Sequence, residues 1–332
     1  MISRQNSLQI KGVAILCMIA FHLYGFPERL PDNVNIWWLG TPMIKALQIC
    51  VPIYLFMSGY GLQCNSLEHG ISWKKIVSKI KKIYILYWTT ILPFIVGGIL
   101  IGYYHVDSIY GVENLLFNVL GVKSTYNGEW WFFSLYIELL VLFFFISRIN
   151  VSLKSYICVM IITLILCRMM NKVFTFDEYT VIGRHLKMII INVNIFMMGC
   201  FFSKYNIYEH IDKNICRYVK NKIVMSFVFI LLPLIVRAYV PLIGITELVV
   251  VPMFALGVAY LCRNIYLAKV LSFMGKHSMT LWLIHTFFIY YYLNEITFLV
   301  NSAAYMFAVV LTLSLCSSLI INLIKNNAFS NN

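Results

Sequence analysis

Charged residues are scarce in this sequence, and their scarcity excludes an ordinary water-soluble domain. Asp, Glu, Lys and Arg together make up 12% of the 332 residues, whereas 61% of the residues are hydrophobic. A soluble domain contains roughly twice that fraction of charged residues. The composition therefore indicates an integral membrane protein.

The sequence also lacks the signs of a cleaved leader, a second domain or a metal site. No small-residue cleavage site follows the first apolar run, which favours a retained membrane anchor over a signal peptide. No internal repeat occurs, and no connecting segment is long enough to form a soluble domain. The nine cysteines include no Cys-x-x-Cys pair and mostly lie in apolar runs, so we interpret them as packing residues. We expect a single transmembrane domain over 1–332 and no bound metal.

What the sequence does contain is a series of apolar runs long enough to cross a membrane. A hydrocarbon core about 30 Å thick requires about 20 apolar residues in a helix. Ten candidates lie near 8–26, 42–64, 83–104, 130–147, 155–170, 187–203, 223–240, 244–262, 279–298 and 302–324. We predict an all-α polytopic membrane protein with about ten transmembrane helices over about 8–325.

The distribution of charge predicts the orientation of these helices, because basic residues collect in cytoplasmic segments. With a cytoplasmic N-terminus, these segments hold 18 of the 26 basic residues: Arg4, Lys11, Lys74, Lys75, Lys79, Lys81, Lys82, Arg148, Lys154, Lys204, Lys213, Arg217, Lys220, Lys222, Arg263, Lys269, Lys276 and Lys325. The outer segments hold most acidic residues: Glu28, Asp32, Asp107, Glu113, Glu129, Asp177, Glu178 and Glu295. Both termini are therefore expected in the cytoplasm, and the net charge of +13 requires no nucleic-acid partner.

The first apolar run carries a histidine in its interior. Lys11 and His22 are eleven residues apart, which is roughly 16 Å along a helix and close to three full turns. With Lys11 at the cytoplasmic boundary, His22 lies near the bilayer midplane on the same helix face. A polar residue at that depth normally faces a protein interior or a watery cavity, and it is a functional candidate. The alternative is a packing histidine bonded to a neighbouring carbonyl.

Two further polar features precede the third run. Ser58 and Gly59 lie near the end of the second run, where small residues allow close helix approach, although Ser58 could instead line a cavity. Lys75, Lys79 and Lys82 share one face of the helix that enters the third run. That face suits anionic lipid head groups or, alternatively, the phosphates of a cytoplasmic ligand.

The fourth and ninth runs also carry polar residues. Trp130 and Trp131 open the fourth run and suit an interfacial aromatic belt. Glu138 lies inside this run, where a carboxylate is costly, so we expect it to pair with a histidine or a lysine or to stay protonated. A loop ending at Ser278 is predicted to lead into the ninth run with that serine as helix N-cap. His285 is then a second intramembrane histidine.

These residues occur in an order that resembles membrane acyltransferase family 3, a bacterial family that includes many polysaccharide O-acetyltransferases. Members place a basic residue, ten other residues and a histidine in the first span. Lys11 and His22 match this spacing, with lysine where the family mostly has arginine. A Ser-Gly-aromatic motif ends the second span of the family and is similar to Ser58, Gly59 and Tyr60.

Later motifs extend the resemblance over about 8–325. The family opens its third span with two basic residues separated by two others, opens its fourth with a tryptophan motif, and carries a late Gly-x-x-Ser…His pattern. The matching residues are Lys79 and Lys82, then 130–132, then Gly275, Ser278 and His285. Many members also carry a Trp-Ser-Leu-x-x-Glu string, which is similar to 133–138 except for its leading tryptophan.

The resemblance implies an enzyme of the plasma membrane that transfers an acetyl group from acetyl-CoA to a hydroxyl of a cell-surface or lipid-linked polysaccharide. The donor is cytoplasmic and phosphorylated, so we expect Lys11, Lys75, Lys79 and Lys82 to bind it. Lysine cannot make the bidentate phosphate contact that arginine makes, which predicts a looser or differently placed grip on the donor. The other expected partners are membrane lipids and the glycan acceptor, and the oligomeric state stays open, a homodimer included.

The same resemblance assigns roles to three polar side chains. His22 would remove the proton of the acceptor hydroxyl as a general base, or would take the acyl group first as a nucleophile. Glu138 would orient the ring or stabilise the imidazolium, and Ser58 would donate to the developing oxyanion. The competing function is a glycan or lipid transporter without chemistry, although the sequence contains no inverted repeat and no pair of broken helices.

Overall fold

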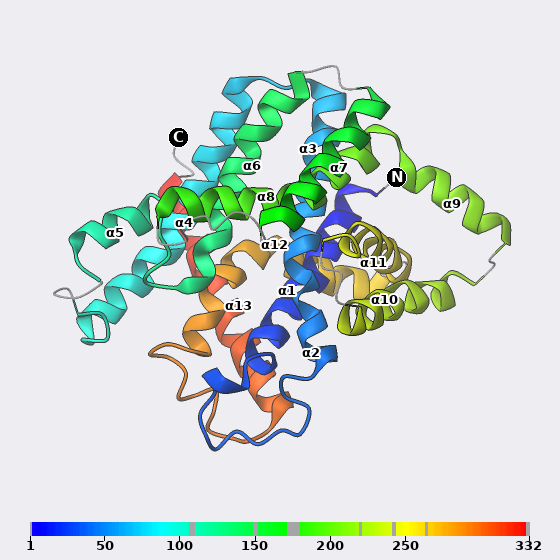
Figure 1. The fold of residues 1–332 in the computed structure, drawn as a ribbon. Coiled ribbons are helices and arrows are strands. Elements are labelled where there is room, and N and C mark those ends of the chain that lie inside the picture. The colour runs from blue at the N-terminus through cyan, green and yellow to red at the C-terminus, as the bar shows by residue number, and fades with distance from the viewer. Residues whose placement is uncertain are drawn as a thin grey trace. The chain divides into compact units, whose positions relative to one another are not determined.

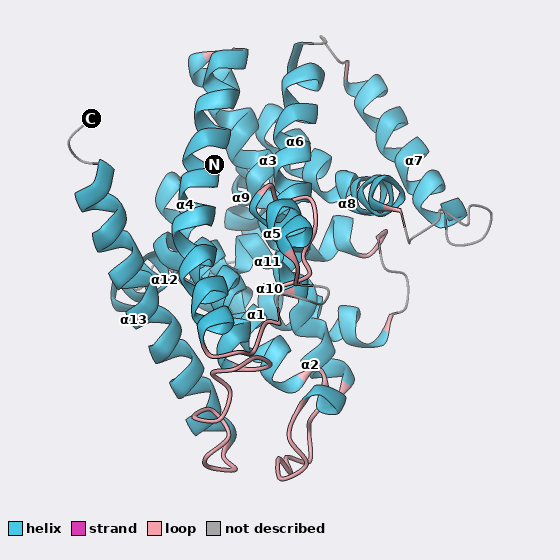
Figure 2. Cartoon of the chain, turned by 90° about the vertical axis from the view of Figure 1, so that its left-hand side faces the viewer, coloured by secondary structure: helices cyan, strands magenta, loops and turns pink. Residues whose placement is uncertain are grey.

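The computed structural model describes residues 2–105, 110–148, 152–170, 180–218, 221–240, 244–262 and 265–329. Within these ranges the chain folds into helices joined by loops, and no strand occurs (Figure 2). The all-α prediction is therefore confirmed. Five residues of the orientation argument lie outside these ranges: Asp107, Asp177, Glu178, Lys220 and Arg263.

Most of the helices, which are labelled in Figure 1, coincide with the apolar runs of the sequence. The α-helices are α1 (Arg4–Tyr24), α2 (Pro42–Ala46), α3 (Cys50–His69), α4 (Trp73–Leu100), α5 (Val112–Val119), α6 (Trp131–Arg148), α7 (Leu153–Met170), α8 (Val181–Lys204), α9 (Ile207–Tyr218), α10 (Lys222–Tyr239), α11 (Glu247–Leu261), α12 (Ile265–Ile284) and α13 (Ala303–Phe329). Short 3-10 helices are η1 (Pro27–Arg29), η2 (Leu47–Ile49), η3 (Gly128–Trp130) and η4 (His285–Phe288).

Seven helical segments of the described chain are long and apolar enough to cross a membrane. They are Arg4–Tyr24, Pro42–His69, Trp73–Leu100, Gly128–Arg148, Val181–Lys204, Lys222–Tyr239 and Ala303–Lys325. Two shorter apolar helices, Leu153–Cys167 and Glu247–Leu261, coincide with the predicted runs 155–170 and 244–262. A multi-pass membrane protein follows from these helices, whereas the count of about ten and the cytoplasmic termini stay predictions.

The ninth predicted span, 279–298, is wrong as a single helix. α12 begins at Ile265 and ends at Ile284, so Ser278 lies inside the helix and is not its N-cap. Leu, Lys and Met, which favour helices, recur in α12. The segment after it is rich in aromatic and β-branched residues, which lose side-chain freedom in a helix. Gly275 belongs to α12, where an added Cβ would lie 1.9 Å from the Leu8 carbonyl oxygen of α1.

The chain divides into two compact units that exchange segments of sequence. The first consists of Met1–Cys17, Ala46–Ile76 and Leu135–Lys276, and the second of Met18–Lys45, Val77–Ser134 and His277–Asn332. The expectation of a single domain over 1–332 stays a prediction.

In the first unit, α3 and α8 pack closely through a pair of glycines. An added Cβ on Gly59 would lie 2.0 Å from the Phe196 carbonyl oxygen, and one on Gly199 would lie 2.0 Å from the Phe56 carbonyl oxygen. Only glycine lets the two backbones approach to this degree, as in other tightly packed membrane helices. The packing interpretation of the predicted small-residue motif therefore holds for Gly59.

In the second unit, two tryptophans join η3 to the end of α12. Trp130 is buried, and its indole Nε1 donates to the Leu283 carbonyl oxygen at 2.8 Å. Trp282 Nε1 donates in return to the Glu129 carbonyl oxygen at 3.2 Å. The predicted aromatic belt is wrong for Trp130, because its apolar body and its N–H are both satisfied inside the protein.

Candidate active site

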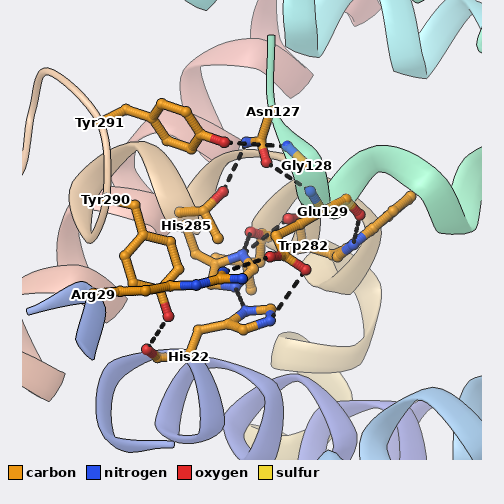
Figure 3. A network of polar contacts seen from close by, with 11 residues as sticks. His22, Arg29, Asn127, Gly128, Glu129, Trp282, His285, Tyr290 and Tyr291 are labelled. Atoms are coloured by element: carbon orange, nitrogen blue, oxygen red, sulfur yellow. Dashed lines mark hydrogen bonds and ion pairs between the residues drawn. The ribbon is translucent and has the colours of Figure 1, made fainter. Parts of the chain in front are cut away.

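Two histidines that are far apart in the sequence meet in the second unit. His22 lies in the last turn of α1 and His285 begins η4. His22 Nδ1 is 2.6 Å from His285 Nε2, and the ring planes are 18° apart (Figure 3). The side chains are almost completely buried, with exposed fractions of 6% for His22 and 0% for His285. The structure thus brings together the two histidines that the sequence indicated separately.

The acceptors around His285 determine which ring nitrogen of each histidine carries a proton. His285 Nδ1 lies 3.0 Å from the Leu281 carbonyl oxygen and 2.9 Å from that of Trp282. Carbonyl oxygens only accept, so Nδ1 is the donor and Nε2 of the neutral ring is the acceptor. His22 Nδ1 must then donate to His285. In a neutral His22 ring, the remaining lone pair is on Nε2.

Glu129 of η3 faces that nitrogen. Its Oε2 is 3.4 Å from His22 Nε2, and its Oε1 is 3.3 Å from Arg29 Nη1. The Glu129 side chain is 20% exposed and that of Arg29 is 47% exposed, so the carboxylate is the more shielded partner. In the sequence, Glu129 is only one of several acidic residues of the outer segments, and no motif indicates Arg29.

Aromatic residues surround the Arg29 guanidinium and hold the end of α1. The guanidinium carbon is 4.4 Å from the centre of the Phe26 ring and 5.4 Å from that of Tyr290. A cation over an aromatic face is attracted by the ring quadrupole. The Tyr290 hydroxyl donates to the His22 backbone carbonyl (Figure 3). Arg29 thus contacts the Glu129 carboxylate, and Tyr290 contacts the His22 backbone.

Four hydrogen bonds fix the turn that carries Glu129, three of them to residues 282–291. They run from Glu129 N to Asn127 Oδ1 at 3.0 Å, from Asn127 Nδ2 to Thr286 Oγ1 at 2.7 Å, from Gly128 N to the Tyr291 hydroxyl at 3.1 Å, and from Trp282 Nε1 to the Glu129 carbonyl oxygen. Asn127 and Thr286 are fully buried. Buried polar side chains with all these partners hold a turn in one conformation.

Glu138 and Ser58, the other two predicted catalytic residues, have partners in the first unit. Glu138 Oε1 is 2.5 Å from His185 Nδ1, and Oε2 is buried without a hydrogen-bond partner among the described residues. Pairing with a histidine agrees with the expectation for a carboxylate inside a span, although the sequence did not indicate His185. Ser58 Oγ donates to the Tyr54 carbonyl oxygen one turn earlier at 2.6 Å.

The lysines predicted to bind the donor differ in their surroundings. Lys75 Nζ donates to the carbonyl oxygens of His69 and Gly70 at 2.6 and 3.2 Å. A cation at this position satisfies the free carbonyls at the end of α3 and complements the helix dipole, so Lys75 has a structural role. Lys79 is half-buried and Lys82 is exposed on α4 in the second unit. Lys11 lies on α1 in the first unit, and its carbonyl oxygen accepts from the Tyr54 hydroxyl.

Comparison with known proteins adds one match. The model of acyltransferase family 3, described as an acyltransferase domain, matches residues 8–323. This match covers nearly the whole chain and includes every site residue described above. No curated protein and no solved structure matches the chain. The family match supports an enzyme and lends no support to a transporter.

Proposed function

Since the chain belongs to membrane acyltransferase family 3, we propose that it transfers an acetyl group from cytoplasmic acetyl-CoA to a hydroxyl of a cell-surface or lipid-linked polysaccharide. Family membership itself indicates a membrane enzyme that transfers acyl groups. The observation that carries the proposal is the buried 2.6 Å contact between His22 and His285. A sugar hydroxyl is a weak nucleophile near neutral pH, and a positioned imidazole is the group that most often activates one.

The chemistry is assigned to one atom, His22 Nε2. This nitrogen takes the proton of the acceptor hydroxyl while the hydroxyl oxygen bonds to the thioester carbonyl carbon. The carbon–sulfur bond then breaks, and the CoA thiolate receives the proton from the ring. His285 keeps the lone pair on Nε2 by accepting from Nδ1. The alternative route, in which His22 takes the acetyl group first, uses the same nitrogen.

Lys11, Lys79, Lys82 and Ser58 keep their predicted roles as proposals, whereas the carbonyl contacts of Lys75 favour a structural role. Lys79 and Lys82 bind the donor phosphates as point charges, and anionic membrane lipids compete for the same lysines. Lys11, on α1, is a separate proposed contact of the donor. Ser58 donates to the oxyanion once its bond to Tyr54 is exchanged. Glu138 was predicted to orient the His22 ring, but the 3.4 Å contact between Glu129 Oε2 and His22 Nε2 supports Glu129 in that role. The proposed location is the plasma membrane, where the cytoplasmic donor and a surface acceptor are both accessible.

The proposal is tested with inverted membrane vesicles that contain the protein and are supplied with acetyl-CoA labelled in the acetyl group. The label is expected to enter the glycan or lipid-linked saccharide fraction and to be released by mild alkali, as an ester is. Vesicles without the protein, and vesicles with His69→Gln, an exposed histidine at the end of α3, are the negative and matched controls. Label that stays in acetyl-CoA would contradict the proposed function. Acetyl recovered on a His22 peptide would identify the acyl-histidine route.

A further inference from the structure

We propose that Glu129, anchored by Arg29, is a positioning residue that holds His22 Nε2 at the reaction centre and stabilises the positive charge formed on the ring during acyl transfer. This inference rests on the proposed function for the reaction itself. It adds a carboxylate and a guanidinium that neither the motifs of the sequence nor the resemblance to the family assigned.

The first support is that the position of Glu129 is built into the fold. Its backbone N–H and carbonyl are both used, by Asn127 Oδ1 and by the indole of Trp282. The amide of Asn127 also bonds Thr286, next to His285, so one buried side chain relates Glu129 to the histidine pair. Hydrogen bonds to Trp282 and, through Asn127, to Thr286 therefore fix the Glu129 backbone relative to the segment that carries His285, unlike an acidic residue of an exposed loop.

The second support is the proton balance at His22 Nε2. With Nδ1 donating to His285, a neutral His22 ring and an ionised Glu129 would face each other as two acceptors at 3.4 Å. Such a contact is favourable only when a proton lies between them or when a hydroxyl bridges them. Imidazole is a stronger base than a carboxylate, so a proton that enters this contact rests on the ring, while Arg29 holds Oε1 of the carboxylate. The arrangement stabilises an imidazolium, the form that His22 adopts after accepting the hydroxyl proton.

The third support is that the other groups facing His22 do not oppose this effect. His285 donates from Nδ1 to two carbonyl oxygens and accepts at Nε2, so in this arrangement its ring is neutral. The Tyr290 hydroxyl donates to the His22 backbone carbonyl, and its uncharged ring lies edge-on to the imidazole with the ring centres 6.3 Å apart. Arg29 is the nearby cation, but it is more exposed than Glu129 and bonds the far carboxylate oxygen. Solvent therefore screens Arg29 more strongly, and Glu129 dominates the electrostatic environment of Nε2.

The test measures the protonation of the His22 ring directly. The protein is labelled with ¹⁵N-histidine, reconstituted in nanodiscs and studied by NMR, in which a ring nitrogen with a proton is distinguished from one without. His22→Gln identifies the His22 signals by their loss. Near neutral pH, Glu129→Gln is expected to lower the fraction of His22 with protons on both nitrogens, whereas Glu129→Asp retains most of it. Arg29→Gln removes a cation and should raise that fraction.

The same variants are then compared in acetyl transfer from labelled acetyl-CoA in vesicles. Loss of a hydrogen bond to a charged group corresponds to about a 10- to 150-fold loss of kcat for Glu129→Gln, with KM for acetyl-CoA unchanged. Glu113→Gln, an exposed carboxylate on α5 of the same unit, is the matched control and should behave as the parent.

Opposite changes in ring protonation for Glu129→Gln and Arg29→Gln would support the inference, because a general structural defect does not produce opposite signs. Unchanged His22 signals in Glu129→Gln would overturn it, whatever the activity. A Glu129→Gln variant that does not insert into membranes leaves the decision to Glu129→Asp and Arg29→Gln, and unchanged His22 signals in both would overturn the inference equally. A parent protein that transfers no acetyl group refutes the proposed function alone, since the NMR comparison requires no substrate.

Discussion

Replacing His285 with asparagine separates the two hydrogen-bonding roles of this ring. The asparagine amide nitrogen can occupy the place of Nδ1 and donate to the Leu281 and Trp282 carbonyls, but the side chain is too short to reach His22. His22 Nδ1 then loses its 2.6 Å acceptor in a site where its side chain is 6% exposed. An unsatisfied buried donor costs about 1–3 kcal/mol, which corresponds to about a 5- to 150-fold loss of rate when it disturbs the reactive tautomer.

The assay is the transfer of labelled acetyl from acetyl-CoA into the glycan fraction of vesicles, with equal amounts of protein in the membrane. His277→Asn is the matched control, because His277 lies two turns earlier on α12 and its Nδ1 contacts Ser318 Oγ at 2.8 Å. We expect the His277 variant to retain the parent rate. Equal losses in both variants, or a parent-like rate for His285→Asn, would refute the tautomer argument.

Two further predictions concern the donor and the packing of the helices. Replacing both Lys79 and Lys82 with alanine is expected to raise KM for acetyl-CoA and to leave kcat unchanged. Lys81→Ala is the control. An unchanged KM in the double variant would favour the lipid-binding interpretation of both lysines. Gly59→Val is expected to lower the thermal midpoint of unfolding in detergent, since overpacking costs about 1–3 kcal/mol or more. Gly61→Val should lower the midpoint much less, because no neighbouring side chain or other segment lies within 4 Å of an added Cβ there. Equal midpoints for the two variants would contradict the close α3–α8 contact.

The helices of the molecule were largely predictable from hydrophobicity, because a membrane span needs a long apolar run. The end of α12 was not, since the apolar run continues beyond Ile284 and hydropathy does not distinguish helix from apolar turns. His285 consequently begins a 3-10 helix instead of lying two turns inside a span. Helix termination there depends on local side-chain preferences and on tertiary contacts that hydropathy omits.

The two histidines of the candidate site could each be predicted from the sequence, but their contact and their partners Glu129 and Arg29 could not. His22 and His285 each stand out as a polar side chain in an apolar run, whereas Glu129 resembles an ordinary acidic residue of an outer segment. Its importance comes from Asn127, which holds the turn against Thr286, and this bond joins positions 159 residues apart. Conversely, Glu138 stands out in the sequence for the same reason as the histidines, but its partner is His185 in the other unit.

The most direct test of His22 as the group that activates the acceptor compares His22→Gln with the parent in cells. Glutamine can retain a structural hydrogen bond but cannot act as a base near neutral pH. Glycan acetylation is measured by mass spectrometry, with membrane levels checked by immunoblot and His22→Ala as a second variant. Loss of a general base predicts a fall of about 10²- to 10⁴-fold in both variants at normal protein level. Acetylation by His22→Gln equal to that of the parent would make His22 a packing residue and would contradict the catalytic assignment.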